Sequence, residues 1–417
     1  MAFTYRNGEL CAEKLPLGEI ARRFGTPCYV YSRAEIERAY GEYSSALAGC
    51  DAIVCYSVKA NPNLAVLALM AKLGAGFDIV SGGELARVLA AGGDPRKTLF
   101  SGVGKSEAEI EQALLAQVLC INLESEPELE RVNAVAVRLG RRAPVAFRVN
   151  PDVDAKTHPY ISTGLRQNKF GVAHDDAERL YAEAARMPNI EIRGIGCHIG
   201  SQLTESAPFV EAATRIVALA RRLEAAGTPI GHIDLGGGIG IRYRDETPQP
   251  VAEFVAGARA ALGSCRARLI LDPGRSVVGN AGLLLTRVEY VKPGPAKNFL
   301  VVDAAMNDLM RPALYDAWHE VRAVCVPRAG GRPATYDVVG PVCESGDFLA
   351  RERSLIAGAG DLLAVMSAGA YGAVQAGTYN TRPLVPEVLV RGEQWAIVRP
   401  RLDADALIAL DRSPSWL

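Results

Sequence analysis

From about residue 53 onward, short apolar runs rich in β-branched residues alternate with amphipathic stretches rich in Ala, Leu, Glu and Arg. This alternation is typical of parallel strands joined by crossover helices. Eight segments are strand candidates: IVCYSVK (53–59), GFDIV (76–80), TLFSG (98–102), CINLE (120–124), VAFRVN (145–150), IRGIGCHIG (192–200), HIDLGG (232–237) and RLILD (268–272). Because eight parallel strands close a barrel, the pattern predicts an α/β fold of the TIM-type (β/α)8 class.

Two of the amphipathic stretches carry helix-end signals. SRAEIERAYGEYSSALAG (32–49) begins with Ser32, a favourable N-cap, and is expected to supply an outer helix of the barrel. FVEAATRIVALARRLEAAG (209–227) ends at Gly227, where a helix C-cap is expected.

After about residue 282 the sequence pattern changes to strand-like runs interrupted by Gly and Pro, with one short helical stretch near 309–320. The runs are LLLTRVEYV, FLVVD, TYDVVG, LLAVM and EVLV. The opening segments FTYRNGELCAEKL, with an Asn-Gly turn, and TPCYVYS are also strand-like and do not fit the barrel repeat. We therefore expect a barrel at 32–281 and a β-sandwich domain formed by 1–31 together with 282–417.

Composition and charge narrow the function classes. The 417 residues are 49% hydrophobic and 22% charged, which is typical of a globular protein. A net charge of -1 provides no field that would attract nucleic acid or an anionic membrane, so neither is an expected partner. No apolar run reaches the ~20 residues of a membrane span, and the first ten residues lack the core of a signal peptide, so a cytoplasmic location is expected. The nine cysteines contain no C-x-x-C pair, so we expect mostly buried thiols, no disulfide framework and no metal site.

The active site of a β/α barrel lies at the carboxyl ends of its strands. The polar residues that end or follow the predicted strands are Lys59, Asp78, Ser81, Glu84, Ser101, Glu124, Arg148, Asn150, His198, Ser201, the Gly236–238 run, Asp272 and Arg275. Lys59 follows an apolar strand, where a partly desolvated amine suits Schiff-base chemistry, although a solvent-reaching lysine is the plainer interpretation. The glycine run and Gly274 suit close approach of a phosphate, or a simple turn.

Three short matches to catalytic motifs fail on spacing. Gly104-Lys105-Ser106 is similar to the end of a P-loop, but the first glycine of that motif falls on Leu99. His319-Glu320 begins a zinc-protease motif, but position 323 is Ala. GGGIGIRY lacks the spacing of a dinucleotide-binding loop.

Eight ordered motifs make the chain resemble the diaminopimelate decarboxylase family of pyridoxal-phosphate (PLP) enzymes, nearly end to end. The motifs are YSVKAN (56–61), FDIVSGGE (77–84), CHIGSQ (197–202), DLGGGIGIRY (234–243), DPGRS (272–276), MNDLMRPALYDAWH (306–319), GPVCESGDFLA (340–350) and AGAYG (368–372). The resemblance implies an alanine racemase-like PLP barrel with a β-sandwich domain, assembled as a homodimer with active sites at the interface.

The resemblance also implies roles for individual residues in holding the cofactor. Lys59 would carry PLP as a Schiff base, and His198 would stack on the cofactor ring. Asp78 is expected to be a further cofactor-binding residue. The phosphate would be held by Ser201, Gly237, the backbone of Gly274 and Arg275, and the Tyr371 hydroxyl.

One cofactor-binding position departs from the family. The family has a Glu beside the ring nitrogen, where its carboxylate keeps that nitrogen protonated, and here the residue is Asp272, one methylene shorter. The segment GAVQAGTYN (372–380) also differs from the family after Tyr371.

The resemblance further implies meso-2,6-diaminopimelate as the substrate and L-lysine and CO2 as products. Arg275 and Arg311 could bind its distal carboxylate bidentately, Tyr315 and Tyr371 could hydrogen-bond to it, and Glu344 could pair with the distal ammonium. Cys343 resembles the proton donor of the family, contributed across the dimer interface.

Several alternatives share this fold. An ornithine or arginine decarboxylase has the same architecture, and a decarboxylase of carrier-linked glutamate could reuse the pocket. Alanine racemase shares the barrel but has no use for the CESGD motif. An inactive PLP-binding paralogue is expected to lose Lys59 or Cys343, and both are present.

Overall fold

The computed structural model describes residues 2–154, 169–326 and 331–417. It divides into two compact units, each described here by itself. One unit consists of Ala39–Arg242 and Glu246–Ser276, and the other of Met1–Arg38, Tyr243–Asp245 and Val277–Leu417. The domain boundaries expected from the sequence, with the barrel at 32–281, stay our proposal.

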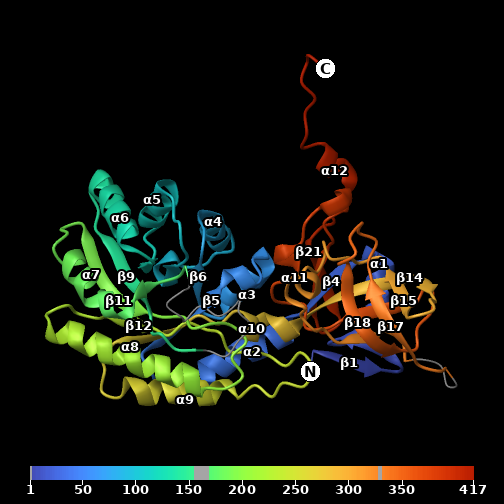
Figure 1. Cartoon of the computed structure of the whole chain (residues 1–417), viewed down its shortest axis with the longest axis horizontal. Helices are drawn as coiled ribbons and strands as arrows, with labels where there is room; N and C mark the ends of the chain where they lie inside the picture. The colour runs from blue at the N-terminus through green and yellow to red at the C-terminus, as the bar shows by residue number, and fades with distance from the viewer. Residues whose placement is uncertain (1, 155–168, 327–330) are drawn as a thin grey trace. The chain divides into compact units, whose positions relative to one another are not determined.

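The first unit is a closed barrel of eight parallel strands (Figure 1). The strands are β5 (Ala52–Ser57), β6 (Gly76–Ile79), β7 (Thr98–Phe100), β8 (Cys120–Leu123), β9 (Ala143–Asn150), β11 (Ile190–Gly196), β12 (His232–Asp234) and β13 (Arg268–Leu271). Each strand pairs in parallel with the next, and β13 pairs with β5 to close the ring. A two-residue strand, β10 (Val172–Ala173), adds to β9. All eight strand candidates from the sequence are therefore confirmed.

Helices follow the barrel strands along the chain and cover them. They are α3 (Leu64–Lys72), α4 (Gly82–Ala90), α5 (Glu107–Ala116), α6 (Glu126–Leu139), α7 (Ala177–Ala184), α8 (Ala207–Ala225) and α9 (Val251–Leu262). Ser106 caps α5 in a full capping box with Glu109, which satisfies backbone donors at the helix start.

Both predicted helix-end signals have the expected geometry. The Ser32 hydroxyl accepts the Glu35 backbone N–H at the start of α2 (Arg33–Ala46), so its N-cap role is confirmed. Helix α8 stops at Ala225, and Gly227 follows with φ 91°, a conformation that glycine adopts without strain.

The second unit is a β-domain whose main sheet has nine strands. In order along the sheet these are β18 (Phe348–Leu355), β17 (Ala334–Val339), β15 (Asn298–Val302), β14 (Gly282–Lys292), β4 (Cys28–Ser32), β20 (Glu387–Arg391) and β21 (Gln394–Arg399), with β19 (Leu362–Val365) and β16 (Val321–Ala323) branching from β14. The predicted β-domain and the entry of 26–32 into its sheet are confirmed. Strands β16, β18 and β21 were not predicted: β16 has three residues, β18 is interrupted by the charged run 351–353, and the apolar run 395–398 of β21 was passed over.

The opening hairpin departs from the expectation. Strands β1 (Phe3–Arg6) and β2 (Glu9–Ala12) pair around the predicted turn, where Asn7 and Gly8 both have positive φ, but with β3 (Leu15–Pro16) they form a separate three-stranded sheet. The opening segment belongs to the β-domain, as expected, but it contacts the main sheet through a bridge between Glu9 and Cys325 and does not extend that sheet. Its apolar side, with helix α1 (Leu17–Phe24), instead packs over a face of that sheet.

Two apolar clusters explain the continuous apolar run in β14. Leu283 and Leu285 belong to one cluster, whereas Leu284 and Val288 belong to the other. Successive side chains of a strand point to opposite faces, so both faces of this strand are covered. Complete burial of each leucine contributes about 1.5–3 kcal/mol. The only other α-helices in the described part of this unit are α11 (Arg311–Tyr315), α12 (Ala404–Ile408) and the shared ends of α2 and α10 (Arg275–Val278).

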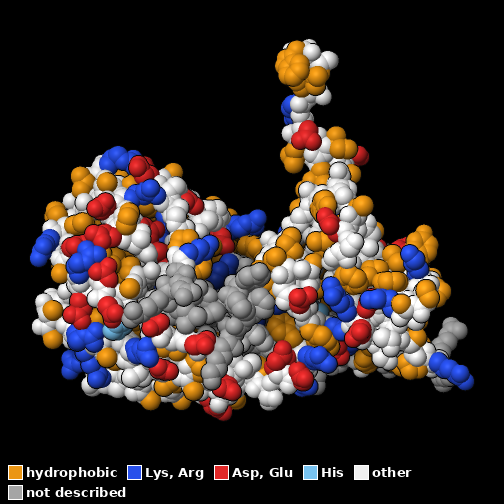
Figure 2. All heavy atoms as spheres, in the orientation of Figure 1, with side chains coloured by type: hydrophobic (Ala, Val, Ile, Leu, Met, Phe, Trp, Pro, Cys, Tyr) orange, Lys and Arg blue, Asp and Glu red, His pale blue; other side chains and the backbone are white. Residues whose placement is uncertain are grey.

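The distribution of charge on the described surface and the make-up of the helices follow the composition, which has a net charge of -1. Positive and negative side chains are intermingled over the face shown in Figure 2. None of the helices in the described ranges is both long enough and apolar enough to cross a lipid bilayer. Five of the nine cysteines are buried, as expected of small apolar side chains: Cys11, Cys28, Cys55, Cys120 and Cys197.

Candidate active site

Lys59 lies at the mouth of the barrel, in the short 3-10 helix Val58–Ala60 that directly follows β5. Its Nζ donates to Asp78 Oδ2 at 2.9 Å, and Asp78 is fully buried in the neighbouring strand β6. The two meet because parallel strands bring their carboxyl ends to one edge. The Lys59 side chain is 36% exposed, so the amine is held by a buried acid but remains open to a ligand.

His198 follows β11 and is neutral at neutral pH. Burial, with the nearby Arg148 and Lys59 cations, lowers the pKa of His198 well below 6.5. The Gly237 backbone N–H donates to His198 Nδ1 at 3.4 Å, which leaves the ring proton on Nε2. Asp272 Oδ1 lies 3.8 Å from Nδ1, too far for a hydrogen bond. His198 is therefore a flat, uncharged ring, as stacking requires.

Asp272 is buried close to two other acidic side chains, Asp234 and Asp78. Burial raises the pKa of Asp272 well above 3.8, and the nearby Asp234 and Asp78 raise it further. Burial likewise raises the pKa of Asp234 to about 7, with Asp78 adding to the rise, although the Gly236 N–H opposes it. Ser57 bridges this region, since its hydroxyl donates to the Asp272 backbone oxygen at 2.8 Å.

The orphaned oxygens of these acids fit a cationic ring. In the part of the chain that the structure describes, Asp272 Oδ1 and Asp78 Oδ1 are buried and have no hydrogen-bond partner. A buried carboxylate without a partner is costly, and a protonated ring nitrogen placed beside Asp272 would remove that cost. The residues present therefore suit a pyridinium cofactor.

Glycines at the ends of β12 and β13 form a tight backbone cradle. A Cβ on Gly237 would lie 2.4 Å from the Asp272 carbonyl oxygen, and one on Gly274 would lie 3.0 Å from both the Ser57 and Ala60 Cβ atoms. Only glycine permits this approach. Arg275, beside Gly274, donates from Nε and NH2 to Ser201 Oγ at 3.3 and 3.0 Å. The structure thus brings Ser201, Gly237, Gly274 and Arg275 to the same end of the barrel.

Arg148 and Glu124 also meet at this end of the barrel. Arg148 NH1 contacts Glu124 Oε1 at 3.3 Å, and Arg148 NH2 donates to the His198 backbone oxygen at 3.3 Å. Glu84, after β6, is also perturbed, since burial raises its pKa to about 7. Sequence reasoning named these residues as strand ends without a role. It missed Asp234 and Ser57, which end β12 and β5 but lie inside the longer predicted segments 232–237 and 53–59. Both belong to the motifs DLGGGIGIRY and YSVKAN, which is the signal that could have found them.

The remaining predicted site residues belong to the β-domain. Arg311 is buried in α11; its NH1 donates to the Tyr243 hydroxyl at 2.7 Å and lies 3.3 Å from His319 Nε2. His319 Nδ1 lies 2.8 Å from the Met366 carbonyl oxygen, so Nδ1 carries the proton and Nε2 accepts from Arg311. The guanidinium also lies 4.8 Å from the centre of the Tyr243 ring. Arg311 is therefore held firmly in one orientation.

Cys343 and Glu344 lie side by side on an exposed loop of the β-domain. The Cys343 backbone N–H donates to Asn380 Oδ1 at 3.0 Å, and Glu344 Oε1 accepts from the Tyr379 hydroxyl at 2.7 Å. Both side chains face solvent in the single chain.

The two predicted tyrosines are half-buried in the same unit. Gln375 Nε2 lies 3.5 Å from the Tyr315 hydroxyl, and Tyr371 has φ 55°, an unusual backbone conformation for a bulky residue. Strained backbone of this kind concentrates at functional sites.

The P-loop-like Lys105 is structural, as its failed spacing indicated. Its Nζ donates to the Gly102 and Asn122 carbonyl oxygens and to Glu128 Oε1, at 2.6, 2.7 and 3.0 Å, and its side chain is 1% exposed. These bonds join the ends of β7 and β8 to α6.

A barrel with a lysine–aspartate pair, a neutral histidine and a glycine cradle at one mouth defines a class of pyridoxal enzyme. Residues 33–279 match the family model described as "Pyridoxal-dependent decarboxylase, pyridoxal binding domain". The chain is 57% identical to the diaminopimelate decarboxylase of Pseudomonas aeruginosa over 98% of both chains.

Solved structures agree. Diaminopimelate decarboxylase from Helicobacter pylori, complexed with L-lysine, has a TM-score of 0.91 and 40% identity, covering 94% of this chain and 98% of that one. The enzyme from M. jannaschii has a TM-score of 0.95 and 36% identity, covering 100% and 99%. The chain belongs to the pyridoxal-dependent decarboxylases and, within them, to the diaminopimelate decarboxylase family.

Proposed function

We propose that this chain decarboxylates meso-2,6-diaminopimelate to L-lysine and CO2, with pyridoxal phosphate bound at Lys59. The Lys59–Asp78 pair at 2.9 Å, in the same mouth as the orphaned Asp272 oxygen, is the observation that carries the proposal. The 57% identity to a diaminopimelate decarboxylase over nearly the whole chain supports this substrate over ornithine, arginine or glutamate.

The residues around the ring have distinct tasks. When bound, pyridoxal phosphate supplies an electron sink for the pair released as the carboxylate carbon leaves. Lys59 Nζ anchors the cofactor, and Asp78 holds that nitrogen in place. Asp272 keeps a proton on the ring nitrogen, and its own high pKa falls once that cation is present. His198 covers one ring face as a neutral imidazole.

The phosphate is placed at the glycine cradle. Gly237 lets it approach the backbone closely, Ser201 supplies a hydroxyl, and the backbone of Gly274 and Arg275 supplies N–H donors, while the Arg275 guanidinium contacts Ser201 Oγ at 3.0 Å. The Tyr371 hydroxyl is the fifth proposed phosphate contact and comes from the β-domain.

The substrate's distal end is recognised by charge and geometry. Arg275 and Arg311 bind the distal carboxylate, since a guanidinium fork matches a carboxylate and the fixed orientation of Arg311 lowers the entropy cost of binding. Tyr315 and Tyr371 donate hydrogen bonds to it, and Glu344 pairs with the distal ammonium. An amine that lacks a distal carboxylate would not make these hydrogen bonds with the two arginines.

Cys343 is the proposed proton donor. Its Sγ–H gives the proton that replaces CO2 on the α-carbon, which completes the reaction. In the single chain Cys343 and Glu344 are exposed, as suits residues that serve the active site of a second copy. We therefore propose a homodimer with shared active sites, working in the cytoplasm.

The test measures CO2 release and lysine formation by the purified protein with pyridoxal phosphate and meso-diaminopimelate. Ornithine, arginine and glutamate are run in parallel. Lysine from diaminopimelate alone is expected. Turnover of ornithine or arginine instead would overturn the proposed substrate.

Lys59→Ala is the control for the cofactor anchor. It should lose both activity and the visible absorption of protein-linked pyridoxal phosphate. A wild-type protein that shows this absorption but turns over none of the four amino acids would also contradict the proposal, and carrier-linked glutamate would be assayed next.

A further inference from the structure

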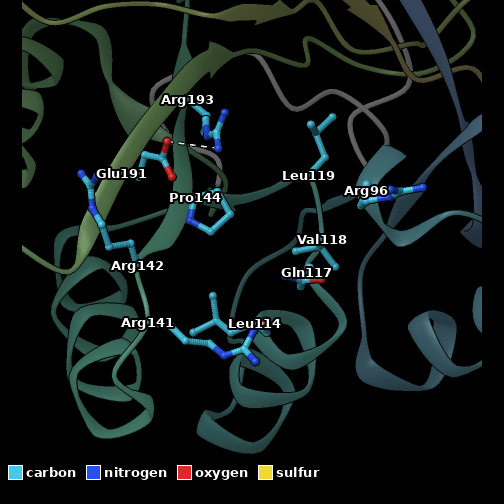
Figure 3. A pocket seen from close by; sticks show the side chains of 10 residues that line it. All are labelled: Arg96, Leu114, Gln117, Val118, Leu119, Arg141, Arg142, Pro144, Glu191 and Arg193. Carbon is cyan, nitrogen blue, oxygen red and sulfur yellow. Dashed lines mark hydrogen bonds and ion pairs between the residues drawn. The ribbon is translucent and has the colours of Figure 1, made fainter.

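The end of the barrel away from Lys59 contains a pocket of about 400 Å3 (Figure 3). It is formed where the chain enters β7, β8, β9 and β11, at the amino ends of these strands. Four arginines, Arg96, Arg141, Arg142 and Arg193, line it against a single acid, Glu191. Its volume lies in the range of small-molecule sites, and its lining carries a surplus of positive charge.

Two of the four arginines already have carboxylate partners. Arg96 binds Asp94 with two hydrogen bonds of 3.1 Å, and Arg193 NH2 lies 3.1 Å from Glu191 Oε1. The other two are held by neutral groups. Arg141 NH1 donates to the Leu114 carbonyl at 2.9 Å, and Arg142 NH2 to the Ile190 carbonyl at 3.1 Å.

Arg141 and Arg142 thus bring cationic charge that is not neutralised. Across the residues the structure describes, neither has a carboxylate at ion-pair distance, in contrast to three arginines of the outer helices: Arg138 with Glu111, Arg179 with Asp176 and Arg222 with Glu178, at 2.7, 2.7 and 2.6 Å. The carbonyl bonds hold each guanidinium in place with further N–H groups to offer. A small anion is the natural counter-charge.

The rest of the lining is mainly apolar. Leu114, Val118, Leu119 and Pro144 lie between the arginines in Figure 3, and Gln117, with φ 59°, adds an amide. The arginines are spread around this apolar surface rather than gathered at one point. A ligand that matches the pocket therefore has several separated anionic groups on a carbon or phosphate framework.

We propose that this pocket binds a small polyanion that carries at least two phosphate or carboxylate groups. Arginine forks bind both groups bidentately, so Arg141 and Arg142 are the residues that capture the ligand. This site is independent of the decarboxylation proposed above, because none of its lining residues belongs to the barrel mouth.

Calorimetric titration of the holoenzyme tests the proposal, with pyridoxal phosphate bound so that the phosphate site at the mouth is filled. The probes are pyrophosphate and citrate, titrated separately in 0.05 M and 0.5 M NaCl. We expect saturable binding of at least one probe, weakened about tenfold by the higher salt because exposed charges are screened. The probe that binds more tightly identifies phosphate or carboxylate as the ligand group.

Arg141→Gln/Arg142→Gln should lower that affinity at least ~10-fold, and Arg141→Lys/Arg142→Lys, which keeps the charge but not the fork, should lower it less. Arg268→Gln is the matched control. Arg268 lies at the same end of the barrel but pairs with Asp51 at 2.7 Å, so its loss should leave binding unchanged. Visible absorption of the bound cofactor checks that each variant is folded. No saturable binding of either probe, or equal binding by the glutamine variant, would overturn the proposal.

Discussion

Three aspartates, Asp78, Asp234 and Asp272, are buried within one another's electrostatic influence at the barrel mouth, where Lys59 is the proposed cofactor anchor. Their proximity makes proton binding and cofactor binding interdependent. Without a nearby ring cation the pKa of Asp272 is far above its usual value, chiefly through burial. A cationic ring beside Asp272 would lower this pKa, so we expect binding of the cofactor to be accompanied by ionisation of Asp272.

The charge of Asp272 is the first property to test. Asp272→Asn removes it with little change of shape, so the ring nitrogen loses its proton more easily and kcat should fall about 10²-fold to 10³-fold, the usual cost of one electrostatic contact to the reacting system. Steady-state lysine formation with saturating pyridoxal phosphate measures this. Asp272→Glu restores the charge and the family's residue and should stay active. An asparagine variant with wild-type kcat would show that Asp272 does not act through its charge.

Asp234 gives a pH-dependent prediction for the cofactor-free protein. Burial is the main cause that raises its pKa from 3.8 to about 7. The folded state therefore favours the protonated form, and the folding stability that this form contributes is lost as pH rises from about 4 to 7. Asp234→Asn should therefore stabilise the protein more at pH 8 than at pH 5, by about 2–3 kcal/mol at 1.36 kcal/mol per pKa unit. Urea unfolding at both pH values measures the difference.

The same asparagine retains an oxygen that can accept the Gly236 N–H, a bond of 2.9 Å in the wild type. A change in packing alone would alter stability equally at pH 5 and pH 8, so the difference between the two values isolates the titration of Asp234. An equal effect at both pH values would mean that Asp234 titrates normally.

At the scale of elements, the ends of β12 and β13 approach each other too closely for side chains. The glycine cradle, Gly237 and Gly274, occupies positions where a side chain would not fit. It is not a flexible loop, because neighbouring atoms fill the space around these two glycines. The proposed cofactor site is therefore shaped by backbone as well as by side chains.

Gly237→Ala should weaken pyridoxal phosphate binding about 10-fold to 100-fold, because overpacking of a tight site costs roughly 1–3 kcal/mol. The new Cβ would lie 2.4 Å from the Asp272 carbonyl oxygen and would push the two strand ends apart. Titration of the apoprotein by visible absorption measures the affinity. Gly41→Ala in α2, where a Cβ meets nothing within 4 Å, is the control and should bind the cofactor normally. Unchanged affinity in the Gly237 variant would mean that the cradle relaxes freely.

At the scale of the whole molecule, the proposed homodimer makes each active site depend on two copies of the chain. Lys59→Ala and Cys343→Ala would each be nearly inactive alone. If subunits exchange, half of the dimers in an equal mixture combine the two variants, and each such dimer has one intact site. The mixture should regain roughly a quarter of wild-type activity.

The same double substitution within one chain is the control for this mixing experiment, because it cannot form an intact site with either variant. Lysine formation before and after mixing measures the recovery. A mixture that exchanges subunits, as seen by mass spectrometry of the dimers, but stays inactive would contradict shared active sites.

The barrel could be predicted because its signals are local. The eight strands are short apolar runs that alternate with helical stretches, two of which carry the end signals Ser32 and Gly227, and the parallel barrel follows from the number of strands. The same reasoning placed Lys59, Asp78, His198 and Asp272 at strand ends, which the closed sheet then gathered at one mouth. The assignment of pyridoxal phosphate to them came from ordered motifs, not from periodicity.

Other features depend on segments far apart in the chain. The β1–β2 hairpin has the expected turn, but whether it extends the main sheet or covers a face depends on Leu283, Leu285 and the other residues it packs against. Strands such as β18 are polar enough that only their neighbours in the sheet define them.

The sequence by itself determined the order of the barrel strands, the class of fold and the polar residues near the end of each barrel strand, because these depend on side-chain patterns a few residues long. Only the tertiary structure decided which charges are left without a counter-charge. The high pKa of Asp272 depends on Asp234 and Asp78, and the arginine pocket joins residues from Arg96 to Arg193. Electrostatic interactions depend on distance in space and on burial, and both are set when the strands close into a barrel.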